Sequence, residues 1–144
     1  MDFKTYTIIG KVTAAISKET VADQAIRSAL KILIGELNID YAVLWHKTES
    51  DQKIHPYYWI APFDLTSQSF DLNEGLIGKA YASESAIIKL DCSEEDGFGP
   101  FNNVKSIVCT PFSCSDIGSG CISFINTKEP MSEDDADVCQ ILTL

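Results

Sequence analysis

The chain has 144 residues, of which 45% are hydrophobic and 10% aromatic, and its 21 acidic against 11 basic residues give a formal net charge of −10. This composition is typical of one packed globular domain and excludes a disordered chain. It also argues against nucleic acid and anionic membranes as partners, because both demand clustered Lys and Arg, whereas the basic residues here are scattered.

Targeting features and cysteine content both predict a cytoplasmic protein. No stretch approaches the roughly 20 apolar residues needed to span a bilayer, and the first residues show no basic segment followed by an apolar run. The 5 cysteines are odd in number and form no CxxC pair, whereas a secreted disulfide framework normally uses an even number.

Two helices are predicted at the start of the chain. The first presents apolar residues at three- and four-residue steps, namely Phe3, Tyr6, Ile9, Val12 and Ile16. The second begins near Thr20, which can form a capping box with Asp23, and ends near Asn38. Its predicted apolar face consists of Ala22, Ile26, Ala29, Leu30, Leu33 and Leu37.

The pattern then changes to alternation, which predicts a β-hairpin formed by residues 41–46 and 54–60. With a symmetric turn, the pairs on one face are His46 with His55, Leu44 with Tyr57, and Ala42 with Trp59. Tyr41, Val43 and Trp45 then point to the opposite face.

The second half of the chain alternates short elements with loops. We predict a short helix over residues 75–82, a brief strand over 86–90, an acidic loop over 91–103, and a second hairpin over 104–126. A last helix begins at Ser132, a good N-cap followed by three acidic residues. The terminal helices are expected to cover one face of an antiparallel sheet, and the short helix and long loop the other.

Four segments together resemble the pattern of GAF domains, which are small-molecule sensory and regulatory domains. They are Gly75–Gly78, Ser106–Pro111, Gly120–Asn126 and Met131–Asp135. The resemblance implies an α+β, GAF/PAS-like fold. In that fold a six-stranded antiparallel sheet carries the N- and C-terminal helices on one face, with a short helix and a long loop over a pocket on the other. Residues 1–144 would form a single GAF-like domain, with an N-terminal helix over 1–18 and the core over 19–144.

The resemblance argues against two of the ligand classes found among GAF domains. Asn126 and Asp135 match the cyclic-nucleotide pattern, but Thr127, Met131 and Ala136 stand where that pattern has Lys, Phe and Glu. Neither histidine lies beside a cysteine, which argues against a covalently attached bilin.

A third subgroup, the free methionine sulfoxide reductases, is also matched poorly. Ile77 stands at the position of one of its cysteines, and residues 100–103 contain none where another is expected. Its substrate-binding carboxylates would fall on Ile107, Ser123 and Ile125, none of which is acidic.

The same matching predicts a pocket whose lining is mainly apolar and aromatic, which suits a planar or hydrophobic small molecule. The predicted ligand-binding residues are Ala42, Leu44, Tyr57, Trp59, Leu76, Ile77, Phe98, Phe101, Asn103, Ile107, Cys109, Cys121, Ser123 and Ile125. Two interpretations of this set remain open, a ligand pocket and a packed core.

Histidines and cysteines are the other candidate functional groups. His46 and His55 would face each other, but two ligands are too few for a structural zinc site, and polar residues near a turn are ordinary. Cys109 and Cys121 are expected to lie diagonally on one face of neighbouring strands as buried, inert thiols. We expect no catalytic residue, no metal ion and no cofactor.

The leading hypothesis is a non-catalytic sensory or regulatory domain that binds an unidentified small molecule and signals through its terminal helices. The apolar first helix also predicts a homodimer, and the resemblance implies an output domain, in a longer protein or in a complex. Two alternatives are a divergent redox enzyme, similar to the free methionine sulfoxide reductases and using Cys92 or Cys109, and a ligand-free dimerisation module.

Overall fold

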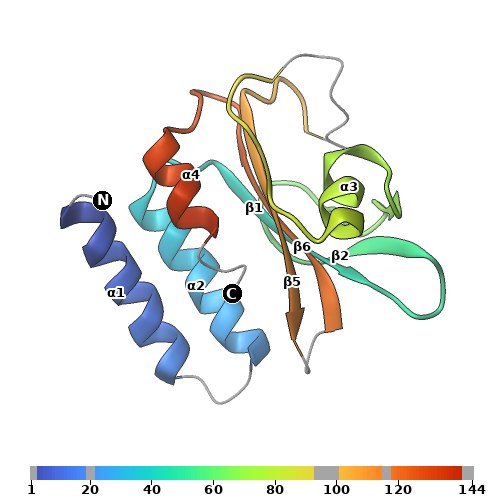
Figure 1. The fold of residues 1–144 in the computed structure, drawn as a ribbon, viewed down its shortest axis with the longest axis horizontal. Coiled ribbons are helices and arrows are strands. Elements are labelled where there is room, and N and C mark those ends of the chain that lie inside the picture. Colours follow the sequence, from blue (N-terminus) through green and yellow to red (C-terminus); the bar gives the residue numbers. More distant parts are fainter. Residues whose placement is uncertain (1–2, 19–21, 93–100, 115–117, 141–144) are drawn as a thin grey trace.

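A computed structural model describes residues 3–18, 22–92, 101–114 and 118–140, and these residues form an α+β fold (Figure 1). The helices are α1 (Phe3–Lys18), α2 (Ala22–Glu36), α3 (Gly75–Ser83) and α4 (Glu133–Cys139). The strands are β1 (Tyr41–Lys47), β2 (Lys53–Ile60), β3 (Phe70–Asp71), β4 (Ile87–Lys89), β5 (Ser106–Cys114) and β6 (Gly118–Asn126). No helix among the described residues is both long enough and apolar enough to cross a bilayer.

The strands form one antiparallel sheet in the order β3-β2-β1-β6-β5-β4, so β1 and β6 lie at its centre. Helices α1, α2 and α4 lie on one side of the sheet and α3 lies on the other (Figure 1). The predicted layering is therefore confirmed for the helices. The strand β3 was not among the strands that the alternation pattern predicts, because it has only 2 residues.

Each side of the sheet has its own hydrophobic core. The helix-side core comprises Ile8, Val12, Ala29, Leu30, Leu33, Leu37, Ile39, Ala42, Leu44, Val108, Ile122, Phe124, Met131, Ala136, Val138 and Cys139. The α3-side core comprises Val43, Trp45, Ile54, Leu65, Phe70, Ile77, Ala80, Phe101, Val104, Ile107, Cys109, Cys121 and Ile125. Because the central strands are covered on both faces, they contribute side chains to both cores.

The helical layer follows the predicted pattern in α2 and departs from it in α1. Helix α2 buries Ala29, Leu30 and Leu33 as expected. Helix α1 buries Thr5, Ile8 and Val12, while Tyr6 is 63% exposed, so the predicted stripe is confirmed at Val12 and wrong at Tyr6. The reason is that α1 carries two overlapping apolar stripes, and contact with α2 selects the one through Ile8.

The predicted orientation of β1 was also wrong. Ala42 and Leu44 face the helices, whereas Val43 and Trp45 belong to the α3-side core. The pairing with β6 explains this, since Val43 lies opposite Ser123 and directly opposed residues share a face. Residues 41–45 of the strand are all apolar or aromatic, so the sequence does not indicate which of them face the helices and which face α3.

A β-bulge in β2 shifts the predicted hairpin register. His46 lies opposite His55 as expected, but Leu44 pairs with Tyr58 and Ala42 with Ile60. The irregularity between Leu44 and Trp45 leaves Tyr57 as the extra residue, and its ring packs against the helix-side core.

The end of β6 is tied to the start of β1 by the side chain of Asn126. This amide accepts a hydrogen bond from the Asp40 N–H (2.8 Å) and donates to the Asn38 carbonyl (2.6 Å). The Asp40 carboxylate in turn accepts from the N–H groups of Thr127 (2.8 Å) and Lys128 (3.1 Å). Asn126 therefore fixes the junction between the helical layer and the sheet.

The predicted N-cap of the last helix is confirmed. Ser132 has an extended backbone, and its hydroxyl accepts a hydrogen bond from the Asp135 N–H at 3.1 Å. The predicted cap Thr20, the acidic stretch of the loop from residue 93 to Pro100, and the hairpin turn at 115–117 lie outside the described residues.

Candidate functional site

Most of the predicted pocket residues on β5, β6 and α3 come together, but they pack against one another. Ile77, Ile107, Cys109, Cys121 and Ile125 are all fully buried in the α3-side core. These side chains fill the space between α3 and the sheet, so at these positions the predicted pocket is a packed core.

Ser123 takes part in this closed layer through a hydrogen bond. Its hydroxyl accepts from the Trp45 indole N–H at 2.9 Å, and both residues are fully buried. The Trp45 ring also meets Phe70 edge-on, with 5.2 Å between the ring centroids. The polar atom of Ser123 is therefore satisfied within the protein.

The remaining predicted pocket residues are dispersed. Ala42, Leu44 and Tyr57 lie on the helix side of the sheet, so their assignment to a pocket with Ile107 and Cys109 was wrong. The other members of the predicted set stand at the margin of the α3 side or beyond it. Trp59 and Leu76 are half-buried against the α3-side core, Asn103 is exposed with φ 57°, and Phe98 lies outside the described residues.

Phe101 belongs to a cluster of three aromatic rings at the margin of the α3 side. Its ring centroid lies 5.5 Å from that of Tyr41 and 5.4 Å from that of Phe63, and the other two are 5.7 Å apart. Phe101 is buried and Phe63 is exposed, so this cluster closes one end of the core.

The start of α3 is held tightly by the glycine motif. A Cβ atom on Gly78 would lie 2.7 Å from the Asp71 carbonyl oxygen, a contact that real Cβ atoms do not make. Gly75 has φ 63°, the left-handed region that glycine favours. These two residues allow α3 to pack closely on the turn that follows β3.

The predicted diagonal placement of the buried Cys109 and Cys121 is confirmed. Cys109 and Cys121 are diagonal neighbours, because Cys109 pairs with Ser123 and Cys121 with Pro111. Burial first, and then a hydrogen bond with Cys109, raise the pKa of the Cys121 thiol well above its ordinary value. Burial also raises the pKa of Cys139. Thiols held in the protonated form are poor nucleophiles.

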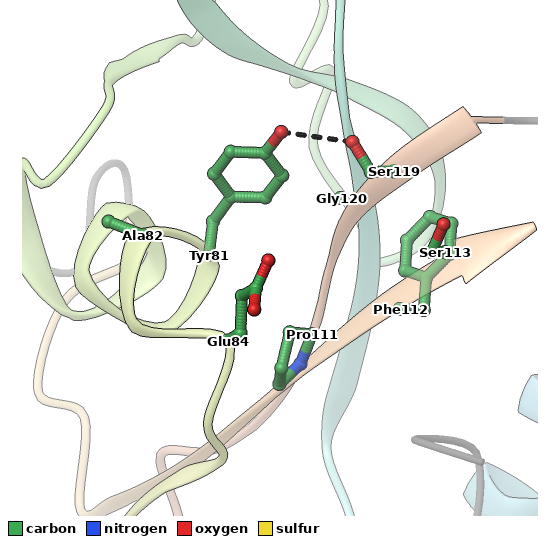
Figure 2. Close-up of a pocket in the computed structure, with 8 residues that line it drawn as sticks. All are labelled: Tyr81, Ala82, Glu84, Pro111, Phe112, Ser113, Ser119 and Gly120. Atoms are coloured by element: carbon green, nitrogen blue, oxygen red, sulfur yellow. Dashed lines mark hydrogen bonds between the residues drawn. The ribbon is translucent and has the colours of Figure 1, made fainter.

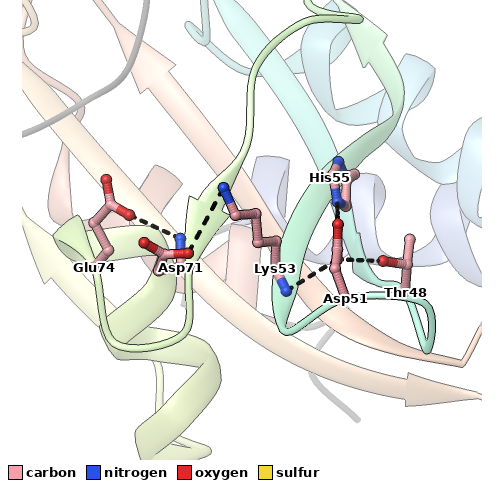
Figure 3. Close-up of polar contacts among 6 residues, drawn as sticks. All are labelled: Thr48, Asp51, Lys53, His55, Asp71 and Glu74. Atoms are coloured by element: carbon pink, nitrogen blue, oxygen red, sulfur yellow. Dashed lines mark hydrogen bonds and ion pairs between the residues drawn. The ribbon is translucent and has the colours of Figure 1, made fainter.

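The two histidines lie opposite each other on β1 and β2, and His55 contacts a carboxylate. His55 Nε2 lies 3.0 Å from the Asp51 carboxylate, which also accepts hydrogen bonds from the Thr48 hydroxyl (2.7 Å) and the Lys53 N–H (3.1 Å) (Figure 3). Burial, followed by the neighbouring His55, lowers the pKa of His46. Across the described ranges, no group of three or more His, Cys, Asp or Glu side chains could hold a metal ion.

A polar group links α2 to β2 across the layer boundary. The Asp23 carboxylate accepts hydrogen bonds from the Arg27 guanidinium at 2.6 Å and from the Tyr57 hydroxyl at 2.8 Å. The Arg27 hydrogen bond is the main cause of the lowered pKa of Asp23. The Arg27 guanidinium also lies over the rings of Tyr57 (5.5 Å) and Tyr58 (4.6 Å).

The structure also contains a cavity of about 400 Å³ that the sequence did not indicate, between the end of α3 and the β5–β6 hairpin. It is lined by Tyr81, Ala82, Glu84, Pro111, Phe112, Ser113, Ser119 and Gly120, none of which is a predicted pocket residue (Figure 2). The Tyr81 and Ser119 hydroxyls are hydrogen-bonded at 2.9 Å. Sequence alone gave no signal for it, because its walls come from three separate elements.

A second hollow of about 440 Å³ lies between the start of α1 and the start of α4. Its charged lining residues are the acidic Glu129, Asp134 and Asp135 and the basic Lys4. It also contains none of the predicted pocket residues.

Comparison with known structures identifies the fold. The GAF domain of a phosphoenolpyruvate-protein phosphotransferase from Acinetobacter superposes with a TM-score of 0.80 at 13% identity, covering 99% of this chain and 90% of that one. The chain has the fold of a GAF domain. The GAF domain of A. aeolicus nlh2 superposes with a TM-score of 0.74 at 12% identity, covering 98% of this chain and 91% of that one.

The GAF fold is shared by an enzyme as well. The free methionine-R-sulfoxide reductase from Neisseria meningitidis, solved in complex with its substrate, superposes with a TM-score of 0.79 at 13% identity, covering 99% of this chain and 87% of that one. Neither the comparison with protein-family models nor that with curated proteins gave a match. At these identities the likeness establishes the fold and leaves the activity to be argued from the residues.

Proposed function

We propose that the chain is a non-catalytic regulatory GAF domain that binds a small molecule on the α3 side of its sheet and relays binding through α1, α2 and α4. The observation that carries the proposal is the arrangement of one sheet between two separate cores, with an open cavity between the end of α3 and the β5–β6 hairpin. A neighbour with this fold was solved with its small-molecule substrate, which supports ligand binding by such a scaffold.

Strands β5 and β6 provide a direct route between the two sides. Along β6, Cys121 and Ile125 enter the α3-side core, while Ile122 and Phe124 enter the helix-side core. A displacement of β6 by a ligand would therefore move side chains against the helices in the same step, because packed interiors transmit strain. This is the physical basis for relay without a hinge.

The polar link between Asp23 and Tyr57 would add to this relay. It joins α2 to β2 by a hydrogen bond of 2.8 Å between two half-buried groups, so a movement of the strand changes a contact made by the helix. A shift of the sheet would change this hydrogen bond and the position of Arg27 above the Tyr57 ring.

The thiols argue for a binding role over a redox enzyme. Cys121 and Cys139 are fully buried with raised pKa values, and Cys109 is fully buried beside Cys121. Cys92 is half-buried and lies 3.5 Å from the Lys89 carbonyl oxygen, to which it donates a hydrogen bond. Thiol-dependent turnover of methionine sulfoxide that is lost in Cys92→Ser or Cys109→Ser would contradict the proposal.

The proposal also includes self-association through the helical layer and a cytoplasmic location. Helix α1 leaves Tyr6 exposed and Ile9 half-buried, and these residues are candidates for a dimer contact. Light scattering that shows a dimer in the wild-type chain and a monomer in Tyr6→Glu is the expected result. A monomer at high wild-type concentration would remove this part of the proposal.

The direct test combines a ligand screen with hydrogen–deuterium exchange. A metabolite library is screened by thermal shift, and each compound that raises the melting temperature is examined by exchange mass spectrometry. We expect protection in α3, β5 and β6 together with altered exchange in α1 or α4. A library in which no compound stabilises the chain, or compounds whose effects stop at the sheet, would favour a ligand-free interaction module.

A further inference from the structure

The cavity between α3 and the β5–β6 hairpin has the chemistry of a specific site. Its polar side chains are the Glu84 carboxylate and the hydroxyls of Tyr81, Ser113 and Ser119, and no basic side chain lines it among the described residues. Its apolar surfaces include the rings of Tyr81 and Pro111, which point toward the same space as Glu84 (Figure 2). A volume of about 400 Å³ lies within the range that small-molecule sites occupy.

Glu84 stands in a backbone conformation that does not favour it. It is the residue that ends α3, with φ 54° and ψ 30°, and this left-handed position is usually taken by glycine. Its N–H donates to the Tyr81 carbonyl at 3.3 Å, so the cap fixes the residue at the cavity edge. In the part of the chain that the structure describes, no cationic side chain pairs with its carboxylate. Glu84 is exposed to solvent at the mouth of the cavity, so its carboxylate can meet a ligand there.

The hydroxyl pair adds hydrogen-bonding capacity. Tyr81 and Ser119 share one hydrogen bond of 2.9 Å, and either oxygen can be the donor. One hydroxyl proton and several lone pairs are therefore left for a ligand. Tyr81 and Glu84 lie beside each other at the end of α3, and Ser119 comes from β6 (Figure 2).

The lining selects the charge of the ligand. The carboxylate attracts a cation and repels an anion, the hydroxyls can accept hydrogen bonds from an ammonium group, and the net charge of −10 attracts cations to the whole surface. One carboxylate is too little for Ca²⁺ or Mg²⁺, which take about six or more oxygen ligands. The tyrosine and proline rings would instead pack on an apolar body attached to the cation.

From these observations we infer that the cavity binds a small organic ammonium compound, with Glu84 as its counter-charge and Tyr81 and Ser119 as hydrogen-bonding partners. The inference rests on the proposed small-molecule function and moves its site from the closed α3-side core to the end of α3. An added carboxylate on the ligand would be repelled by Glu84, so an amine should bind more tightly than the corresponding α-amino acid.

The test uses 2-phenylethylamine as the probe, with 2-phenylethanol as its uncharged analogue and phenylalanine as the analogue with a carboxylate. Binding to the full chain is followed by two-dimensional amide NMR. We expect the amine to shift the amides of Tyr81, Glu84 and Ser119 and to bind at least about tenfold more tightly than either analogue, a difference of about 1.4 kcal/mol. Equal binding of amine and alcohol, or shifts elsewhere, would overturn the inference.

Three variants locate the charge. Glu84→Gln should weaken amine binding by about tenfold, a difference of about 1.4 kcal/mol, while Glu49→Gln, an exposed carboxylate on the β1–β2 turn, makes the same change of net charge and should leave it unaltered. Glu84→Gly removes the carboxylate and fits the left-handed backbone, so it should lose binding and unfold at a higher temperature. Full affinity in both Glu84 variants would refute the site.

These outcomes separate the inference from the proposed function. If the amine fails while another compound stabilises the chain and alters exchange in the helices, the cavity assignment is wrong and the regulatory function stands. If the amine fails and no library compound binds, both are wrong.

Discussion

Replacing Asn126 with alanine tests whether this residue is structural. Its side chain is 1% exposed and bridges two backbone groups, the Asp40 N–H at 2.8 Å and the Asn38 carbonyl at 2.6 Å. Asn126→Ala removes both hydrogen bonds, each of which contributes about 1 kcal/mol net, and leaves the partly buried Asp40 N–H without its partner. We expect the free energy of unfolding to fall by about 2–3 kcal/mol.

The assay is equilibrium unfolding in urea, followed by tryptophan fluorescence. Asn102→Ala, the same substitution at an exposed position, serves as the control and should change stability by no more than about 0.5 kcal/mol. A loss below about 1 kcal/mol in Asn126→Ala would refute the bridging role. Asn126 is also one of the residues that match the cyclic-nucleotide pattern, so a variant of unchanged stability would return it to the candidates for ligand binding.

Further predictions concern the sheet and its contacts. Gly120→Ala should unfold in much less urea than the wild type, because its Cβ would lie too close to the Trp45 carbonyl oxygen for any real structure to accommodate; a wild-type midpoint would contradict the packing. The fold lowers the pKa of His46 below its ordinary value of 6.5, so the unfolded chain binds a proton at this residue more readily than the folded chain does. Neutral His46 is therefore compatible with full stability above pH 6.5, and the free energy of unfolding should decrease as the pH falls below 6.5 toward the folded pKa. His46→Gln should flatten that part of the profile, and His55→Gln should raise the NMR-measured pKa of His46; unchanged profiles would show that burial and the neighbouring charge are not the cause. Tyr57→Phe should cost about 1 kcal/mol in urea unfolding through its lost hydrogen bond to α2, and no loss would deny that link.

The sequence predicted the layers of this fold better than the faces of its strands. Helix α2 has a single apolar stripe beside polar positions, so its buried residues Ala29, Leu30 and Leu33 could be named in advance. Strand β1 is buried on both faces, so Ala42 and Val43 look alike in the sequence although they enter different cores. The pairing of β1 with β6 decides which side chains face which core, and this pairing depends on the whole sheet.

The site was harder to predict than the fold, for reasons that are also physical. The bulge at Tyr57 changes which side of the sheet the following β2 residues face, and no turn residue near it in the sequence predicts a bulge. The predicted pocket layer is filled because Ile77, Ile107 and Ile125 meet without a gap, and side-chain volume over three elements is not encoded in any local pattern. The cavity beside Glu84 arises in the same non-local way, from the distance between the end of α3 and the β5–β6 hairpin.

Native mass spectrometry of the purified chain, compared with its denatured mass, tests the central claim most directly. The account predicts a reproducible added mass that is lost on denaturation, of a size that fits a cavity of about 400 Å³, and a smaller fraction of the chain carrying it in Glu84→Gln. A chain whose native and denatured masses agree, and whose mass stays unchanged after incubation with the amine probe and with the metabolite library, would contradict it and identify a closed interaction module.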